Sequence, residues 1–209
     1  MSKYLFLSAT DLEHNELEIF GSEIHIIGVG KINAAMNTTR LIEKYNPSHV
    51  INFGSCGNLQ NHKIWEVLTV GKVYNNIDVR PFAEYGHTPF HGLGAITLQG
   101  KSDIKCFSTD QFYDKHRTDY ADKYLEMVKK CDIVDMELYS IAQVCSRYNK
   151  LLYSFKWISD DGDSSKWEEN AKKGYINFKQ RIKQLFTDGK NLIWPHKGSY
   201  TVSRPKVLG

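Results

Sequence analysis

The stretch EIHIIGVGKINAAMNTTRLIEKYNPSHVINFGSCGN, residues 23–58, decides the fold class of this chain. It opens with an apolar run that ends at Gly28 and Gly30. Apolar residues then recur at helical spacing as far as Asn46 and Pro47, and a second apolar run again ends in glycine. The order of strand, glycine turn, helix and strand predicts a βαβ unit, which requires a parallel sheet with a covered face. The sequence therefore predicts an α/β protein.

The rest of the chain continues this alternation. We expect further strands over 3–9, 66–74, 92–100 and 151–159, and helices over 138–148 and 167–185. Ser165 and Glu168 have the spacing of a capping box at the start of the last helix. Because no repeat or low-complexity linker interrupts the chain, we expect one domain over residues 1–190. Residues 191–209 lack periodicity and predict a loose tail.

Composition narrows the range of partners. The 209 residues are 41% hydrophobic, enough for one core, and the formal charge of +3 is spread too evenly to predict nucleic-acid binding. The four cysteines form no CxxC pair, which favours reduced thiols over a zinc site or a disulfide framework. No apolar run approaches the ~20 residues of a membrane span. We therefore expect a cytoplasmic protein without a membrane partner.

The GVGK sequence at residues 28–31 invites comparison with phosphate-binding loops. A Walker loop needs a longer glycine spacing and a Ser or Thr after the lysine, where this chain has Ile32. A dinucleotide fingerprint needs a third glycine where Asn33 stands. The sequence therefore predicts a tight turn between strand and helix, with no nucleotide cofactor.

The acidic segment SDDGD at residues 159–163 does not fit a calcium loop. Counting from Asp160, the sixth residue is Ser165 instead of glycine, and the twelfth is Ala171 instead of glutamate. The histidines of HTPFH, residues 87–91, are separated by a proline that disrupts helical spacing. We expect no metal site.

Carboxylates follow several predicted strands. Glu13 comes just after the first strand, Asp160 follows directly on the strand over 151–159, and Asp135 and Glu137 precede a helix. Ligands of α/β sheets bind beyond the carboxyl ends of strands. Each carboxylate alone is more typical of a cap or a turn, but together they predict a site for acid–base chemistry.

Five blocks of the sequence, taken in order, resemble the purine nucleoside phosphorylase and nucleosidase superfamily. They are residues 28–59, 76–90 (NIDVRPFAEYGHTPF), 108–112 (STDQF), 134–145 (VDMELYSIAQVC) and 156–163 (KWISDDGD). The chain is most similar to the 5'-methylthioadenosine/S-adenosylhomocysteine nucleosidases, over roughly residues 3–187. The resemblance implies a single α/β domain with a twisted central mixed β-sheet flanked by helices, of the nucleoside phosphorylase type.

The resemblance also implies catalytic roles. Asp160 corresponds to the general acid that shares its proton with N7 of a purine, and Ser159 orients it. Glu137 corresponds to the ribose-binding glutamate, and Met136 packs against the sugar. Glu13 corresponds to the residue that positions the attacking water.

Further positions correspond to the substrate-binding residues of the family. Phe112 matches the aromatic residue that stacks on the base, and the backbone of Tyr113 reads the edge of the base. Ser55 and Gly57 line the sugar and water side. Lys156 stands where the nucleosidases usually have arginine.

The resemblance implies a homodimer as well. In the family's dimers, the block containing Val79 and Phe82 reaches into the 5' pocket of the neighbouring subunit. Arg80 and Trp167 depart from the family near this pocket, so a different or charged 5' substituent is expected to be possible. The segments 13–28 and 89–106 are shorter than in the family.

The expected reaction is hydrolysis of an adenine nucleoside with a modified 5' position. An N-glycosidic bond breaks through an oxocarbenium-like state, which requires protonation of the leaving base and delivery of water. Asp160, at the end of an apolar strand and beside two more aspartates, is expected to have a raised pKa. An aspartate in the acid position favours adenine, and Arg40, the first arginine, comes too late to match the phosphate ligand of the phosphorylases. Phosphorolysis and non-catalytic nucleoside binding remain open alternatives.

Overall fold

A computed structural model describes residues 3–89, 94–100, 102–187 and 191–192. Within them, ten strands form one mixed sheet: β1 (Tyr4–Ser8), β2 (Glu18–Ile19), β3 (Ser22–Ile26), β4 (His49–Asn58), β5 (Val67–Thr69), β6 (Lys72–Asn75), β7 (Ile96–Thr97), β8 (Lys105–Ser108), β9 (Ile133–Asp135) and β10 (Leu151–Asp160). The helices are α1 (Lys31–Tyr45), α2 (Asp122–Lys130), α3 (Leu138–Arg147) and α4 (Trp167–Leu185), with short 3-10 turns at η1 (Asp11–Glu13) and η2 (Ser164–Lys166).

The long strand β4 lies at the centre of the sheet. The strand order is β2-β3-β1-β4-β9-β8-β6-β7, while β10 pairs with β4 and β5 pairs with β10. Strand β1 is parallel to β3 and β4, and β10 is parallel to β4, whereas β9 runs antiparallel to the end of β4. The predicted βαβ unit is confirmed as β3-α1-β4, with β1 inserted between its two strands. The predicted mixed sheet is confirmed as well.

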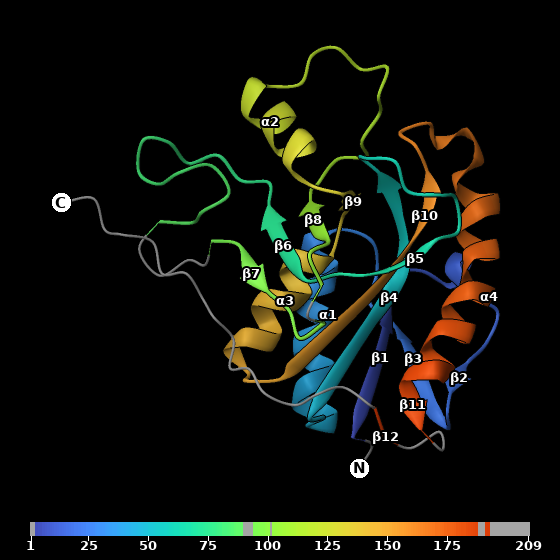
Figure 1. Cartoon of the computed structure of the whole chain (residues 1–209). Helices are drawn as coiled ribbons and strands as arrows, with labels where there is room; N and C mark the ends of the chain where they lie inside the picture. Colours follow the sequence, from blue (N-terminus) through green and yellow to red (C-terminus); the bar gives the residue numbers. More distant parts are fainter. Residues whose placement is uncertain (1–2, 90–93, 101, 188–190, 193–209) are drawn as a thin grey trace.

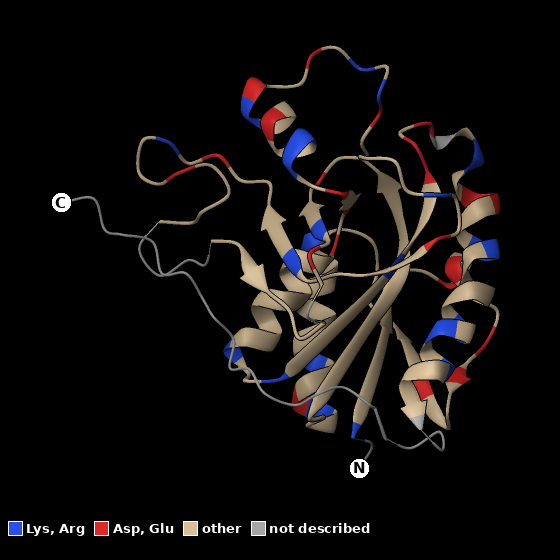
Figure 2. Ribbon diagram, viewed as in Figure 1, with Lys and Arg blue, Asp and Glu red and all other residues tan. Residues whose placement is uncertain are grey.

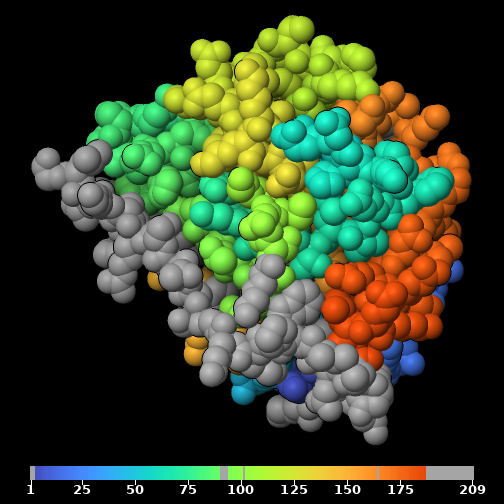
Figure 3. All heavy atoms as spheres, viewed as in Figure 1, coloured from blue at the N-terminus to red at the C-terminus, as the bar shows by residue number. Residues whose placement is uncertain are grey.

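Helices cover both faces of the sheet (Figure 1). Because side chains of a strand alternate between faces, Leu5 and Leu7 of β1 join the core beneath α1 and α3, while Tyr4 and Phe6 join the core beneath α4. In Figure 3, α4 lies along one edge of the molecule and the segment around α2 forms its top. This double covering explains why β4 and β10 are buried along almost their whole length.

A close contact fixes α4 against the end of β10. A Cβ atom on Gly174 would lie only 2.0 Å from Cδ1 of Trp157, so the helix must have glycine there. The indole N–H of Trp157 donates to the carbonyl of Ala171 at 2.9 Å. Because Trp157 precedes Asp160 by three residues, this contact also fixes the part of β10 that carries the predicted acid.

The expected strand over 66–74 is wrong, since the structure has two strands there. The N–H of Val70 still donates to Ser154 of β10, whereas the N–H of Gly71 donates to Ile104, next to β8. The chain therefore leaves one side of the sheet and joins the other between residues 70 and 71. Strands β5 and β6 share an apolar pattern that does not reveal this change of partner.

The region after β6 departs further from prediction. Of the strand expected over 92–100, only Ile96–Thr97 forms, and residues 92–93 lie outside the described residues. The sequence did not predict β8, α2 or β9. The helical spacing of Tyr124, Met127 and Val128, which α2 buries, is the signal that would have identified this helix.

The capping box predicted for the last helix is wrong, although the helix itself is confirmed. Helix α4 begins at Trp167, its N-cap position is Lys166, and no side chain caps it. The N–H of Ser165 instead donates to Asp163 Oδ1 at 3.0 Å, because the turn η2 precedes the helix.

The surface charges and the carboxyl terminus complete the description. In Figure 2, basic residues (Lys and Arg) and acidic residues (Asp and Glu) are interspersed along the ribbon. Asn191–Leu192 (β12) pairs with Phe186–Thr187 (β11), while the rest of the predicted tail over 191–209 lies outside the described residues. In the part of the chain that the structure describes, no helix has the length and apolar character needed to span a membrane.

Candidate active site

A pocket with a cavity volume of about 210 Å³ opens where β1, β4, β9 and β10 end. Eight of the predicted site residues line it. They are Glu13, Ser55, Gly57, Phe112, Tyr113, Met136, Glu137 and Asp160. Ser159 lies just behind the wall and is fully buried. Val79 and Phe82 lie outside this pocket, on the loop after β6, and Phe82 is 76% exposed.

Three hydrogen bonds hold the carboxylate of Glu13. The hydroxyl of Ser8 donates to Oε2 at 2.9 Å, while the backbone N–H and the hydroxyl of Ser55 donate to Oε1 at 2.6 and 2.7 Å. A Cβ atom on Gly54 would lie 2.7 Å from Oε2, so the carboxylate fits against β4 only because residue 54 is glycine. Glu13 is 3% exposed, and its position is set by both β1 and β4.

Trp167, the first residue of α4, closes the same side of the pocket. Its indole N–H donates to the hydroxyl oxygen of Ser55 at 3.2 Å. The sequence identified Trp167 as a departure from the family, and the structure places it in the pocket wall beside Ser55 and Glu13.

Asp160 lies in a different environment. Its Oδ2 accepts from the hydroxyl of Ser159 at 2.9 Å and its Oδ1 from the N–H of Gly162 at 3.0 Å. Burial raises the pKa of Asp160, and the charges of Asp161 and Asp163 raise it further, which outweighs the opposite effect of the two donors. The predicted raised pKa is confirmed in direction.

The GVG turn binds a carboxylate of the protein itself. The N–H of Gly30, at the start of α1, donates to Oε1 of Glu137 at 2.8 Å. Burial and the nearby charge of Asp135 raise the pKa of Glu137 to about 7, although Lys156 and the Gly30 N–H act in the opposite direction. The turn thus holds the side chain that was predicted to bind the ribose.

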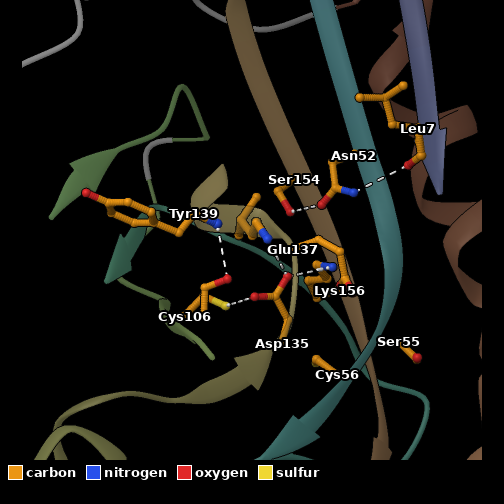
Figure 4. Close-up of polar contacts among 12 residues, drawn as sticks. Leu7, Asn52, Ser55, Cys56, Cys106, Asp135, Glu137, Tyr139, Ser154 and Lys156 are labelled. Carbon is orange, nitrogen blue, oxygen red and sulfur yellow. Dashed lines mark hydrogen bonds and ion pairs between the residues drawn. The ribbon is translucent and has the colours of Figure 1, made fainter. Parts of the chain in front are cut away.

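A buried ion pair lies beneath the pocket (Figure 4). Lys156 Nζ is 3.0 Å from Asp135 Oδ2, which also accepts the N–H of Leu138 at 2.9 Å. Burial lowers the pKa of Lys156, but the charges of Asp135 and Glu137 raise it by more, so the lysine stays protonated. The sequence did not predict this pair. The sign that Lys156 needs a buried partner is its position in a strand whose other residues are almost all buried.

Aromatic residues support the loop after β8. Tyr113 stacks on Tyr120 with 5.9 Å between ring centroids, and Tyr120 stacks on Tyr124 at 4.5 Å. Phe112, one residue earlier, lines the pocket and is 42% exposed. The column of rings therefore fixes the loop and leaves one aromatic side chain available at the pocket mouth.

Lys115 and Asp161 join this loop to the loop after β10, and we call their contact the Lys115–Asp161 clasp. Lys115 Nζ is 2.7 Å from Asp161 Oδ2, and the Lys115 N–H donates to the carbonyl of Gly162 at 3.1 Å. The clasp connects the segment that carries Phe112 with the segment that follows Asp160.

The carboxyl groups that line the pocket are those of Glu13, Asp135, Glu137 and Asp160. Among the described lining residues there is no lysine, arginine or histidine. Arg80 pairs with Asp78 on an exposed loop at 2.6 Å and does not line the pocket. No group of three or more metal-binding side chains occurs among the described residues. The pocket therefore favours neutral or cationic ligands over anions.

The sequence missed several lining residues that flank the predicted ones. Thr10 stands three residues before Glu13, Gln111 precedes Phe112, and Val134 lies in β9, two residues before Met136. They carry no chemical signature of their own, and only their neighbours indicate them.

A family model of the phosphorylase superfamily matches residues 19–82. The 5'-methylthioadenosine/S-adenosylhomocysteine nucleosidase of Staphylococcus epidermidis (strain ATCC 12228 / FDA PCI 1200) is 31% identical over 168 residues, which cover 71% of this chain and 70% of that protein. The enzyme of the same name from Bacillus thuringiensis subsp. konkukian (strain 97-27) is 28% identical over 204 residues, covering 87% and 83%. The crystal structure of the Colwellia psychrerythraea 34H nucleosidase in complex with adenine has a TM-score of 0.73 at 21% identity, covering 91% and 98%.

Proposed function

The chain belongs to the 5'-methylthioadenosine/S-adenosylhomocysteine nucleosidases of the phosphorylase superfamily, and we propose that it hydrolyses the N-glycosidic bond of an adenine nucleoside with a modified 5' position. The products are adenine and the 5-substituted ribose. One observation carries the proposal: Glu13 and Asp160 are buried carboxylates in the same pocket, and they are held in different ways.

Asp160 is the proposed general acid. Because burial raises its pKa, its carboxyl group retains a proton more readily than an exposed aspartate. As the C1'–N9 bond breaks, its electron pair moves into the purine, and Asp160 donates its proton to N7. Ser159 and Gly162 orient the carboxyl group through their hydrogen bonds.

Glu13 is the proposed partner of the attacking water. The water oxygen forms the new bond to C1', and its proton passes to the carboxylate. The bonds from Ser8 and Ser55 fix this carboxylate, while Gly54 leaves it room against β4.

Glu137 and Met136 form the proposed sugar site. An ionised Glu137 accepts hydrogen bonds from the ribose hydroxyls, and its charge stabilises the developing positive charge on the sugar. Gly30 fixes one oxygen of Glu137, so the orientation of the carboxylate depends on α1. Lys156 neutralises Asp135 beneath this site and limits the accumulation of negative charge.

The proposed base site lies between the loops after β8 and β10. Phe112 stacks on the purine, and the backbone of Tyr113 reads its edge, while Asp160 approaches N7. Gly57 keeps this wall open, because a Cβ atom there would lie 3.3 Å from Asp160 Oδ1 and 2.9 Å from Cγ1 of Val134.

Hydrolysis is favoured over phosphorolysis by the charge of the pocket. The described lining residues include four carboxyl groups and no lysine, arginine or histidine, and the buried Lys156 is already paired with Asp135. An inorganic phosphate beside Glu13 would meet repulsion without a compensating cation. The same reasoning disfavours nucleoside 5'-phosphates as substrates.

We also propose a cytoplasmic homodimer. Exposed apolar side chains occur at the start of α1 and on the loop after β6, among them Val29, Ile32, Met36 and Phe82. A partner that covers them would bring its own Val79 and Phe82 toward the 5' end of the substrate. The four cysteines are free and buried, which suits a reducing compartment.

The test is product identification. The protein is incubated with methylthioadenosine, adenosylhomocysteine, 5'-deoxyadenosine, adenosine, AMP and inosine, each with and without phosphate. We expect free adenine from the 5'-modified nucleosides without added phosphate, and no cleavage of AMP. Strict dependence on phosphate, with a ribose 1-phosphate product, would establish phosphorolysis instead. Nucleoside binding without any product would establish a binding protein.

A further inference from the structure

We propose that Trp167 is a positioning residue, whose indole N–H directs the hydroxyl proton of Ser55 onto Glu13. This inference rests on the proposed function, because it assigns Trp167 a part in preparing Glu13 for the attacking water. It goes beyond the role of Trp167 as an apolar wall of the pocket.

The three residues form a chain of hydrogen bonds. Trp167 Nε1 donates to Ser55 Oγ at 3.2 Å, and Ser55 Oγ donates to Glu13 Oε1 at 2.7 Å. A hydroxyl group has one proton and two lone pairs, whereas an indole nitrogen can only donate. Because Trp167 occupies a lone pair of Ser55, the hydroxyl proton is left for Glu13.

This chain leaves one oxygen of Glu13 with an unused lone pair. Oε1 accepts both the N–H and the hydroxyl of Ser55, at 2.6 and 2.7 Å, so both of its lone pairs are used. Oε2 accepts only the hydroxyl of Ser8 among the described residues, at 2.9 Å. Oε2 therefore retains a site for the attacking water, and Oε1 acts as an anchor.

The start of α4 is held firmly enough to give Trp167 this role. Asn170, one turn later, donates from Nδ2 to the carbonyl of Ser159 at 2.8 Å, and Ala171 accepts the indole N–H of Trp157 at 2.9 Å. Both partners belong to the end of β10 that carries Asp160. Trp167 therefore links β10, which carries Asp160, to the carboxylate of Glu13.

A simple packing role and the positioning role make different demands. Packing needs the aromatic ring, whereas positioning needs the N–H group. Trp167→Phe keeps the ring and removes the N–H. Trp65→Phe is a matched control, because the indole of Trp65 also donates to a residue of α4, Oδ1 of Asn170 at 3.2 Å, but does not line the pocket.

The kinetic test uses the full-length protein with methylthioadenosine. We expect Trp167→Phe to lower kcat by about fivefold to twentyfold, with KM within about twofold of wild type, as for one lost hydrogen bond. In a Ser55→Ala background the same substitution has no further effect. Trp65→Phe stays within about twofold in both constants. The proposal fails if the two phenylalanine variants behave alike, if only KM changes, or if the effects of Trp167→Phe and Ser55→Ala multiply.

A second test does not need turnover. Each tryptophan gives one indole N–H signal in a ¹H–¹⁵N spectrum, and the Trp167 signal is the one that Trp167→Phe removes. Ser55→Ala is expected to move this signal and leave that of Trp65 in place. An unmoved signal refutes the hydrogen bond whatever the activity. A wild-type protein that cleaves no nucleoside, but whose Trp167 signal responds to Ser55→Ala, refutes the proposed function alone.

Discussion

Glu13 and Asp160 are both buried carboxylates in one pocket, at 3% and 5% exposure, yet the fold treats them differently. Glu13 lies in a short turn after β1 and receives three hydrogen bonds, two of them from Ser55 on the neighbouring strand. Asp160 ends β10, and its donors among the described residues are its sequence neighbours Ser159 and Gly162. Burial raises the pKa of Asp160 despite those donors.

The difference supports the opposite proton roles proposed for these two groups. Glu13 lies opposite another strand and meets hydrogen-bond donors that the sheet supplies. Asp160, at the end of an apolar strand and beside two more aspartates, meets fewer donors and has a raised pKa. We call the side of the pocket that holds Glu13 the water side, and the side that holds Asp160 the acid side.

The largest expected effect lies on the acid side. Asp160→Asn keeps the shape of the side chain but removes the transferable proton, so kcat is expected to fall by about 10³-fold without loss of the fold. Adenine release and thermal unfolding measure the two effects. Asp103→Asn is the control, because Asp103 is exposed and does not line the pocket. Near-normal activity of Asp160→Asn would place the acid elsewhere.

The water side is expected to respond somewhat less. In Gly54→Ala the new Cβ atom would lie 2.7 Å from Glu13 Oε2, so the carboxylate must move, and kcat is expected to fall by about 10²-fold. The same substitution in a Glu13→Gln background tests the cause, since it should add little there. Independent, multiplying losses would show that Gly54 acts through some other group.

Glu137 tests whether burial acts on a third carboxylate as it does on Asp160. Its pKa is raised from 4.5 to about 7 in the fold, so its contribution to stability is present below about pH 4.5 and is lost as pH rises through 7. Relative to Glu137→Gln, the unfolding free energy of the wild type is expected to fall by roughly 2–3 kcal/mol between about pH 4.5 and 8. Urea unfolding at both pH values measures it. Parallel pH dependence in the two proteins would contradict the raised pKa.

The smallest effect is expected at the Lys115–Asp161 clasp, which joins the loop after β8 to the acid side. Lys115→Ala is expected to raise KM by about twofold to fivefold and leave kcat nearly unchanged, because an exposed ion pair contributes little. Lys123→Ala is the matched control, since Lys123 forms a similar exposed pair with Glu126 on α2. A drop in kcat of the size expected for Asp160→Asn would show that the clasp positions the acid directly.

The elements that sequence reasoning identified are those with long periodic patterns. The helix over 31–45 and the strand ending at Asp160 follow from apolar spacing and glycine or proline boundaries, and the site residues on them follow as well. Short elements such as β8 and β9 carry too few residues for a pattern. Their partners are chosen by tertiary contacts that no local signal records.

The same limit applies within the site. The family resemblance indicated Asp160 and Glu137, which belong to two of the five blocks, and Glu13, which follows the first strand in ATDLEH, residues 9–14. It did not indicate the Lys156–Asp135 pair, since a salt bridge between residues 21 positions apart depends on how β9 and β10 are brought together. The hydrogen bond from Trp167 to Ser55 spans 112 positions and was equally inaccessible.

Helix α1 joins two properties that are usually considered apart. The N–H of Gly30, the residue before α1, holds Glu137 in the proposed sugar site, while Ile32 and Met36 on α1 belong to the apolar surface of the proposed dimer. In that dimer, association that orders α1 would also order the contact between Gly30 and Glu137, so dimerisation and ribose binding would be linked equilibria. Catalysis would then depend on protein concentration. Dilution below the dissociation constant of the proposed dimer is expected to weaken substrate affinity. Saturating substrate is expected to stabilise the dimer.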